Sequence, residues 1–171
     1  MKLILLVIVV ILCTVIGYLY GEEFNNRYLQ LKELMRVIID LQNEIMYSHT
    51  PIPEGLDKIA LKTKEPVNIL LSSISKKLMN NEVSDIYTAF NESIYEHKKQ
   101  LSLKEGDYNI LLDLSKSLGE TSIYGQESIF QLAKEKLNDE LEVSYEESKK
   151  NTKVYRSLGI GIGLMIAIFL I

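Results

Sequence analysis

Residue types able to bind a metal or transfer protons gather at one place in this sequence, between positions 44 and 57. Glu44, His49, Glu54 and Asp57 bring three carboxyl groups and one imidazole close together along the chain. Their spacing matches no standard metal site, whereas helix ends are commonly rich in capping groups and solvated charges. We therefore expect a structural helix end here, with no metal and no cofactor.

The motifs of nucleotide-dependent and hydrolytic enzymes are absent from the sequence. It contains no GxxxxGK[ST] phosphate loop, no HExxH, no CxxC and no GxSxG. Gly159-x-Gly161-x-Gly163 resembles part of a dinucleotide fingerprint, but that motif needs a preceding strand and an acidic residue about twenty positions later. The sequence provides neither, so we expect a protein that is not an enzyme. An active site that leaves no motif is the alternative.

Small residues near both ends of the chain recur with a helical period. Gly159, Gly163 and Ala167 are spaced by four and share one helix face, and Gly17 and Gly21 do the same near the start. Small residues let membrane helices approach closely, so we predict that these five residues pack the two terminal helices together. A partner protein's helix and simple exposure of the glycines to lipid are the alternatives.

Both ends of the chain are apolar runs without charge. As helices, Leu3 to Tyr20 would be about 27 Å long and Leu158 to Ile171 about 21 Å, against a bilayer hydrocarbon core of about 30 Å. In a soluble core apolar residues alternate periodically with polar ones, so unbroken runs indicate lipid. We predict transmembrane helices at 1–21 and 157–171, the first of them an uncleaved signal anchor.

The residues between the spans, 22–156, are predicted to form one helical cytoplasmic domain. The stretch from 21 to 157 holds all 23 acidic residues and 18 of the 19 basic ones, so its net charge is −5. A nucleic-acid-binding domain needs a basic surface, so we expect no nucleic acid as a partner. The single cysteine, Cys13, lies in the first apolar run and excludes a disulfide framework.

Apolar residues in this domain recur at three- and four-residue spacing, which predicts helices. We therefore predict an all-α fold, a cytoplasmic bundle of about six helices between an N-terminal and a C-terminal transmembrane helix. The first helix should continue to Tyr47 as one rod unless Gly17 or Gly21 bends it, and the last should run from near Gln126 into the second span, because no proline interrupts either. The other four are expected at about 51–61, 66–78, 84–97 and 105–118.

Short polar residues and glycine mark the expected helix ends. Each assignment rests on a side chain that can hydrogen-bond a free backbone group, or on the conformational freedom of glycine. The predicted markers are Thr50 and Ser84 as N-caps, Ser102 with Glu105 as a capping box, and Gly119 as the residue that ends the fifth helix.

Three segments together resemble the stage III sporulation protein AB family of endospore-forming bacteria. They are LQNEIMYSHTPIPEGLDKIA (Leu41 to Ala60), SLGETSIYGQ (Ser117 to Gln126) and YRSLGIGIGL (Tyr155 to Leu164). The first is the most specific, since it resembles the family's helix-end pattern of Glu, Ile, Tyr and then Thr-Pro, with a mild departure at Pro53. The resemblance extends over nearly the whole chain.

The resemblance makes Glu44, Tyr47, Thr50 and Pro51 candidate motif and interaction residues. The residues themselves favour a structural role first: Tyr47 is expected to bury its ring at the turn with its hydroxyl hydrogen-bonded. No catalytic, cofactor-binding or metal-binding residue is assigned.

The resemblance also implies a function. The family's soluble domain is similar to the cytoplasmic domain of platform proteins in type II secretion and type IV pilus machines. It implies a non-enzymatic platform in a secretion-like complex between mother cell and forespore, required for endospore formation, on the mother-cell side of the outer forespore membrane. The implied partners are a secretion-type ATPase and other membrane proteins of the complex. The apolar runs add the lipid bilayer as a partner, and whether the chain also forms a homo-oligomer is left open. A membrane-anchored regulatory adaptor that captures one soluble partner is the alternative.

The first testable prediction concerns orientation. Seven Lys or Arg residues flank the inner ends of the two runs and one, Lys2, lies outside, so the domain should be cytoplasmic with both termini across the membrane. Single cysteines at Ser72 and Lys2, in a background without Cys13, report this through an impermeant maleimide added to intact cells. Position 2 should label and position 72 should not, and the opposite pattern would reverse the assignment.

Overall fold

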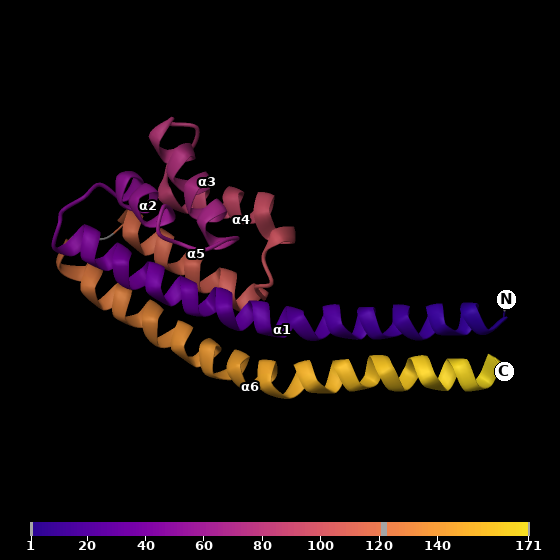
Figure 1. The fold of residues 1–171 in the computed structure, drawn as a ribbon. Helices are drawn as coiled ribbons and strands as arrows, with labels where there is room; N and C mark the ends of the chain where they lie inside the picture. Colours follow the sequence, from indigo (N-terminus) through magenta and orange to yellow (C-terminus); the bar gives the residue numbers. More distant parts are fainter. Residues whose placement is uncertain (1, 121–122, 171) are drawn as a thin grey trace. The chain divides into compact units, whose positions relative to one another are not determined.

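The structure, a computed structural model, describes residues 2–120 and 123–170. Its described part is entirely helical, without a strand, which confirms the all-α prediction (Figure 1). The helices are α1 (Lys2–Met46), α2 (Ile52–Ala60), α3 (Val67–Met79), α4 (Ile86–His97), the short 3-10 helix η1 (Lys98–Gln100), α5 (Glu105–Glu120) and α6 (Ile123–Leu170). The two predicted spans include Met1 and Ile171, and the SLGETSIYGQ segment includes Thr121 and Ser122; these four residues lie outside the described part.

The chain divides into two compact units. Residues 29–141 form one, here called the bundle unit, and residues 1–28 with 142–171 form the other, here called the helix-pair unit. Helices α1 and α6 contribute to both. They run without a break for 45 and 48 residues, as the absence of proline predicts. Helix α6 begins at Ile123, three residues before the expected Gln126.

The core of the bundle unit is built from one stripe of apolar side chains on each helix. The predicted stripes are largely the buried ones, because residues three and four apart share a helix face. Ile69 is an exception on α3, since it is 37% exposed. Side chains at this three- and four-residue spacing with at most 6% exposure include Leu31, Leu34, Val37, Ile38, Leu41, Leu70, Ile74, Phe90, Ile94, Tyr108, Leu111, Leu114, Leu118, Phe130, Ala133 and Leu137.

Thr50 does not cap α2, contrary to the prediction. Pro51 occupies the N-cap position without a side-chain hydrogen bond. The Thr50 hydroxyl instead donates to Glu44 Oε2 at 2.7 Å. Hydrogen bonds to an ionised acceptor are roughly twice as strong as neutral ones, so the carboxylate outcompetes the capping role.

The N-cap of α4 lies one residue after the predicted Ser84. Asp85 accepts the Thr88 backbone N–H at 2.8 Å, and the Ser84 hydroxyl donates to the Asp85 carboxylate at 2.9 Å. A carboxylate interacts better than a hydroxyl with the positive end of a helix. The hydrogen bonds from Thr88, backbone first, lower the pKa of Asp85.

The capping box predicted at Ser102 and Glu105 is also wrong. Helix α5 begins at Glu105, and the Lys104 N–H donates to Asp107 Oδ2 at 2.8 Å. The Ser102 N–H donates to the Gln30 side chain at 2.9 Å. The fully buried Asp107 therefore supplies the reciprocal contact that the sequence pattern placed on Glu105.

Gly119 does not end α5. It lies inside the helix, and no described glycine has a positive φ. The left-handed conformation is instead adopted by His49 and Asn81, at φ 51° and 53°. These residues follow α1 and α3, where the helix ends need it.

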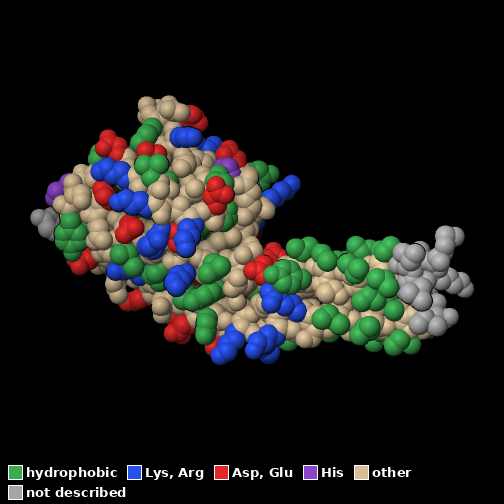
Figure 2. Space-filling model, in the orientation of Figure 1, with side chains coloured by type: hydrophobic (Ala, Val, Ile, Leu, Met, Phe, Trp, Pro, Cys, Tyr) green, Lys and Arg blue, Asp and Glu red, His purple; other side chains and the backbone are tan. Residues whose placement is uncertain are grey.

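Two helices of the described part are long and apolar enough to cross a membrane, within Val7–Met46 and Glu127–Phe169. Figure 2 shows hydrophobic side chains along their terminal segments, without charged ones among them, and mixed charges over the helices of the bundle unit. In a soluble protein such long helices would be buried, but here the most apolar windows are 11% buried. The fold is thus a helical bundle flanked by candidate transmembrane helices at both ends.

Candidate functional site

The family-motif residues lie at the turn from α1 to α2. The chain leaves α1 through His49 in its left-handed conformation, and the Thr50 N–H returns to the Glu44 carbonyl oxygen at 2.9 Å. The Glu44 carboxylate accepts the Thr50 hydroxyl at 2.7 Å and the Lys58 ammonium at 3.4 Å. One side chain of α1 thus holds both the turn and the helix that follows it.

The electrostatics of this turn favour an ionised Glu44. The hydrogen bond from Thr50 is the main cause that lowers the pKa of Glu44. Desolvation, the second cause, raises this pKa, and the positive charge of Lys58 lowers it by a smaller amount. A carboxylate held ionised by a hydroxyl and an ammonium group is a poor proton donor or acceptor near neutral pH. The contacts of Glu44 with Thr50 and Lys58, here called the Glu44 clamp, join α1 to the turn and to α2.

Tyr47 and Pro51 lie at the same turn but face solvent. Tyr47 is 78% exposed, so the prediction that its ring is buried is wrong. The physical reason is its place beyond Met46, the last residue of α1, where the stripe of buried side chains has already ended. The structure therefore brings Glu44 and Thr50 together and leaves Tyr47 and Pro51 available to a partner.

Within the described residues, no three His, Cys, Asp or Glu side chains are grouped so that they could hold a metal ion. Glu44, His49, Glu54 and Asp57, the only cluster the sequence offered, do not form such a group.

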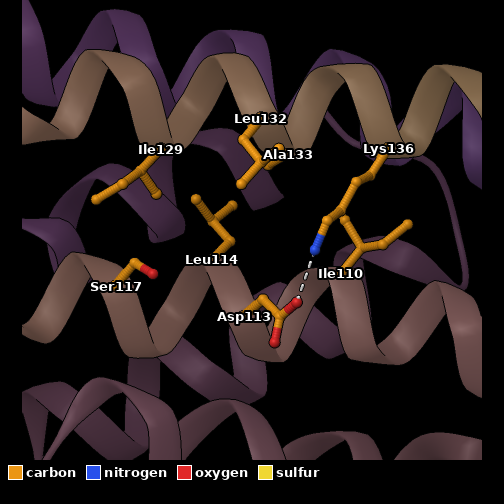
Figure 3. Close-up of a pocket in the computed structure, with 8 residues that line it drawn as sticks. All are labelled: Ile110, Asp113, Leu114, Ser117, Ile129, Leu132, Ala133 and Lys136. Carbon is orange, nitrogen blue, oxygen red and sulfur yellow. Dashed lines mark hydrogen bonds and ion pairs between the residues drawn. The ribbon is translucent and has the colours of Figure 1, made fainter.

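A small hollow between α5 and α6 was not visible from the sequence (Figure 3). Its volume is about 50 Å³, with Leu114 and Ile129 among its apolar lining and an ion pair between Lys136 and Asp113 of 3.0 Å at its edge. Pockets for small molecules are typically about 300–1,000 Å³. This hollow has room for a few waters only.

A larger hollow of about 640 Å³ lies over α3 and α4 and is polar. Lys77 bridges Glu92 and Glu96 at 3.1 and 2.9 Å, and these hydrogen bonds, Glu96 first, raise the pKa of Lys77. The lining also includes Asn68 and His97, each of which has one buried polar atom without a hydrogen-bond partner. The hollow offers hydrogen-bonding surface. Two lysines, Lys76 and Lys77, line it, and the ammonium group of Lys77 is already paired with two glutamates.

The predicted glycine face lies between α1 and α6 within the helix-pair unit. A Cβ atom added at Gly17 would lie 2.6 Å from the Tyr155 carbonyl oxygen, and one added at Gly159 would lie 2.8 Å from that of Cys13. Real Cβ atoms essentially never come so close to backbone, so only glycine fits at these two positions.

The other small residues extend the same contact at four-residue steps. A Cβ atom added at Gly21 would lie 3.1 Å from the Thr152 carbonyl oxygen, and one added at Gly163 would lie 3.1 Å from the Val10 Cα. The Thr152 hydroxyl donates to the Gly21 carbonyl oxygen at 2.9 Å. Ala167, at the end of the face, is partly exposed. Successive contacts involve higher residue numbers in α1 and lower residue numbers in α6, so the two helices are antiparallel.

Aromatic rings and an arginine gather where the apolar segments end. The Tyr20 and Tyr155 rings stack at 6.3 Å, and the Arg156 guanidinium lies 4.4 Å from the Tyr18 ring while it pairs with Glu22 at 3.1 Å. Tyrosine and arginine are typical of the boundary between membrane and water. Three tyrosines from opposite ends of the chain thus lie at one level of the helix pair.

These features define a helical bundle protein with a pair of candidate membrane helices as its anchor. The family model of stage III sporulation protein AB matches residues 2–171, so the chain belongs to this family, which associates it with sporulation. The stage III sporulation protein AB of Bacillus subtilis (strain 168) is 29% identical over 170 residues, covering 99% of both chains. A solved structure of a stage III sporulation protein AB is 28% identical with a TM-score of 0.67, and the match covers 72% of this chain and 96% of that one.

The second prediction concerns the Glu44 clamp. Because the folded-state pKa is lowered from its ordinary value of 4.5, the clamp stabilises the fold above that pH and is lost as the pH falls through the lower folded value. Glu44→Gln should lower the urea midpoint of the full chain in detergent at pH 7, and its difference from the unchanged chain should shrink below pH 4.5. Glu54→Gln, on an exposed glutamate of α2, is the matched control. A difference that does not depend on pH would contradict the prediction.

The third prediction concerns the glycine contact. Gly159→Leu places side-chain atoms against the backbone of α1, and overpacking of this kind costs about 1–3 kcal/mol. Gly161→Leu adds the same apolar volume where nothing lies within 4 Å. Gly163→Cys provides the readout, because its Cβ would lie 3.2 Å from the Cys13 Cβ, just under the separation of a disulfide. The initial rate of disulfide formation should fall in the Gly159→Leu variant and stay unchanged in the Gly161→Leu variant; equal rates would exclude close packing at Gly159.

Proposed function

We propose that this protein is a non-enzymatic platform component of a secretion-like complex between mother cell and forespore, required for endospore formation. In this proposal both ends cross the outer forespore membrane, and the bundle unit lies on its cytoplasmic, mother-cell side. The complex would include a separate secretion-type ATPase, which docks on the bundle unit.

The observation that carries the proposal is the continuity of α1 and α6. Each helix contributes residues to the apolar helix pair and to the core of the bundle unit without a break in its helical backbone. A continuous helix resists bending and transmits force along its axis, whereas a loop between anchor and domain would not. This is the construction expected of a protein that fixes a moving partner to a membrane.

The sequence supports a separate protein as the ATPase of the proposed complex. It has no phosphate loop, so nucleotide hydrolysis by that route has to be supplied by another protein. The similarity of the family's soluble domain to platform proteins of type II secretion and type IV pilus machines supports a docked ATPase as that source.

The bundle unit also carries large side chains that its own core does not use. Tyrosine in particular is enriched at protein interfaces, where a ring and a hydroxyl serve together. Three side chains stand out by their exposure: Tyr47 at 78%, Leu61 at 83% and Tyr95 at 85%. We expect these three side chains to contact a docked partner.

The fourth prediction is the experiment that tests this function. The full chain, tagged and carrying a photo-crosslinking amino acid at Tyr47, Leu61 or Tyr95 in turn, is purified from sporulating cells after irradiation. A secretion-type ATPase should be crosslinked from at least one of these positions, and other membrane proteins of the complex should co-purify. The matched control carries the crosslinker at Met165, which is 70% exposed at the apolar end and should capture no ATPase.

The other outcomes decide against the platform. Recovery of one soluble protein, with neither ATPase nor further membrane proteins, would identify a membrane-anchored adaptor instead.

A second copy of the chain with a different tag, expressed in the same cells, shows whether the protein also forms a homo-oligomer.

A further inference from the structure

Two ion pairs between described residues of the helix-pair unit are made by arginines. Arg27, only 3% exposed, lies 3.1 Å from Glu147, and Arg156 lies 3.1 Å from Glu22. Both pairs join α1 to α6. Arginine suits such sites because its planar guanidinium donates in fixed directions.

The lysines of the same stretch of α6 are differently placed. Lys149, Lys150 and Lys153 are exposed, and within the described residues none of them has an ion-pair partner. Lys149 has one further contact, its ammonium lying 5.9 Å from the centre of the Tyr145 ring. Three exposed positive charges therefore lie close together on one helix.

The three lysines lie close to the level at which the apolar segment begins. Tyr155 marks that level, and at 1.5 Å per residue Lys153 is about 3 Å and Lys149 about 9 Å from it along the axis. A headgroup region is about 5–8 Å deep on each side of the hydrocarbon core, and charges in water act over about 8–10 Å. All three ammonium groups can reach a headgroup layer that begins at Tyr155.

Nearby carboxylates form no ion pair with these lysines in the described part of the chain. Glu22 and Glu147 are already paired with the arginines. Glu23 and Glu146 are the other acidic residues close by, and both are exposed to water without an ion pair to any of the three lysines. Long lysine side chains can extend toward the membrane while the shorter glutamates remain in water.

We propose that Lys149, Lys150 and Lys153 form a binding surface for the headgroups of anionic phospholipids in the leaflet next to the bundle unit. The proposal rests on insertion of the helix pair into a bilayer and does not depend on the platform function. An anionic leaflet suits this surface because it presents many phosphates in one plane, at the level where the three lysines lie. The surface would hold the helix pair at a fixed depth and enrich anionic lipid around it.

The fifth prediction tests this surface with the full chain in phosphatidylcholine bilayers. These contain a trace of either spin-labelled phosphatidylglycerol or spin-labelled phosphatidylcholine, and electron paramagnetic resonance separates lipid immobilised by the protein from free lipid. The ratio of the two association constants gives the preference for the anionic headgroup. The triple variant Lys149→Gln, Lys150→Gln, Lys153→Gln should lose about fivefold or more of this preference, since one lysine near an anionic surface contributes about that factor.

The controls separate charge at this place from charge in general. Lys64→Gln, Lys99→Gln and Lys116→Gln together remove the same charge from exposed positions of the bundle unit and should leave the preference unchanged. The triple Lys→Arg variant at 149, 150 and 153 should keep it, and added salt should weaken it.

Four outcomes would overturn the proposal. The first two are an unchanged preference in the Lys→Gln variant at 149, 150 and 153, and an equal loss of preference in the control variant. The third is displacement of the anionic lipid by inorganic phosphate beyond the effect of ionic strength. The fourth is the absence of immobilised lipid of either kind. The last would show that the helix pair does not face lipid. None of these results bears on whether an ATPase co-purifies.

Discussion

In an apolar surrounding every backbone N–H and C=O group has to find its partner inside the protein, and a continuous helix is the simplest way to meet this requirement. Helices α1 and α6 meet it from their apolar ends through to the bundle unit. The hydroxyl of Thr14, inside the first apolar run, donates to the Val10 carbonyl of its own helix at 2.8 Å. With the backbone groups of the apolar segments satisfied within each helix, close packing, which glycine permits, joins the two helices there.

The bundle unit follows the opposite rule, since its helices are joined by burial of apolar side chains. Buried polar groups there still need partners: the Ser75 hydroxyl, fully buried, donates to the Pro53 carbonyl at 2.8 Å and ties α3 to the start of α2. The hydroxyl of Tyr108 is a buried group without a described partner, and desolvation is the main cause that raises its pKa to about 12. Its protonated form is therefore kept across the physiological range.

Sequence patterns predicted what depends on many residues at once and failed where one hydrogen bond decides. The apolar stripes and the unbroken α1 and α6 follow from periodicity and from the positions of proline, to which many residues contribute. Thr50, Ser84 and Ser102 each had a neighbouring carboxylate or amide that competed for the same backbone or hydroxyl group. Which of these hydrogen bonds forms depends on which groups the fold brings close together. Glu44, for example, lies six residues before Thr50 and still accepts its hydroxyl. The exposure of Tyr47 was missed for another reason, because α1 ends one residue before it, at Met46.

The glycine contact alone would not fix how far α1 and α6 slide along each other. Because the glycines recur every four residues, a shift of one turn, about 6 Å, would place Gly17 opposite Gly163 and Gly21 opposite Gly159, again glycine against glycine. The same shift would separate Arg27 from Glu147 and leave a buried guanidinium without its carboxylate, which is strongly destabilising. The small residues therefore supply close packing, and the ion pair beyond the apolar segment selects one of the two registers that this packing accepts.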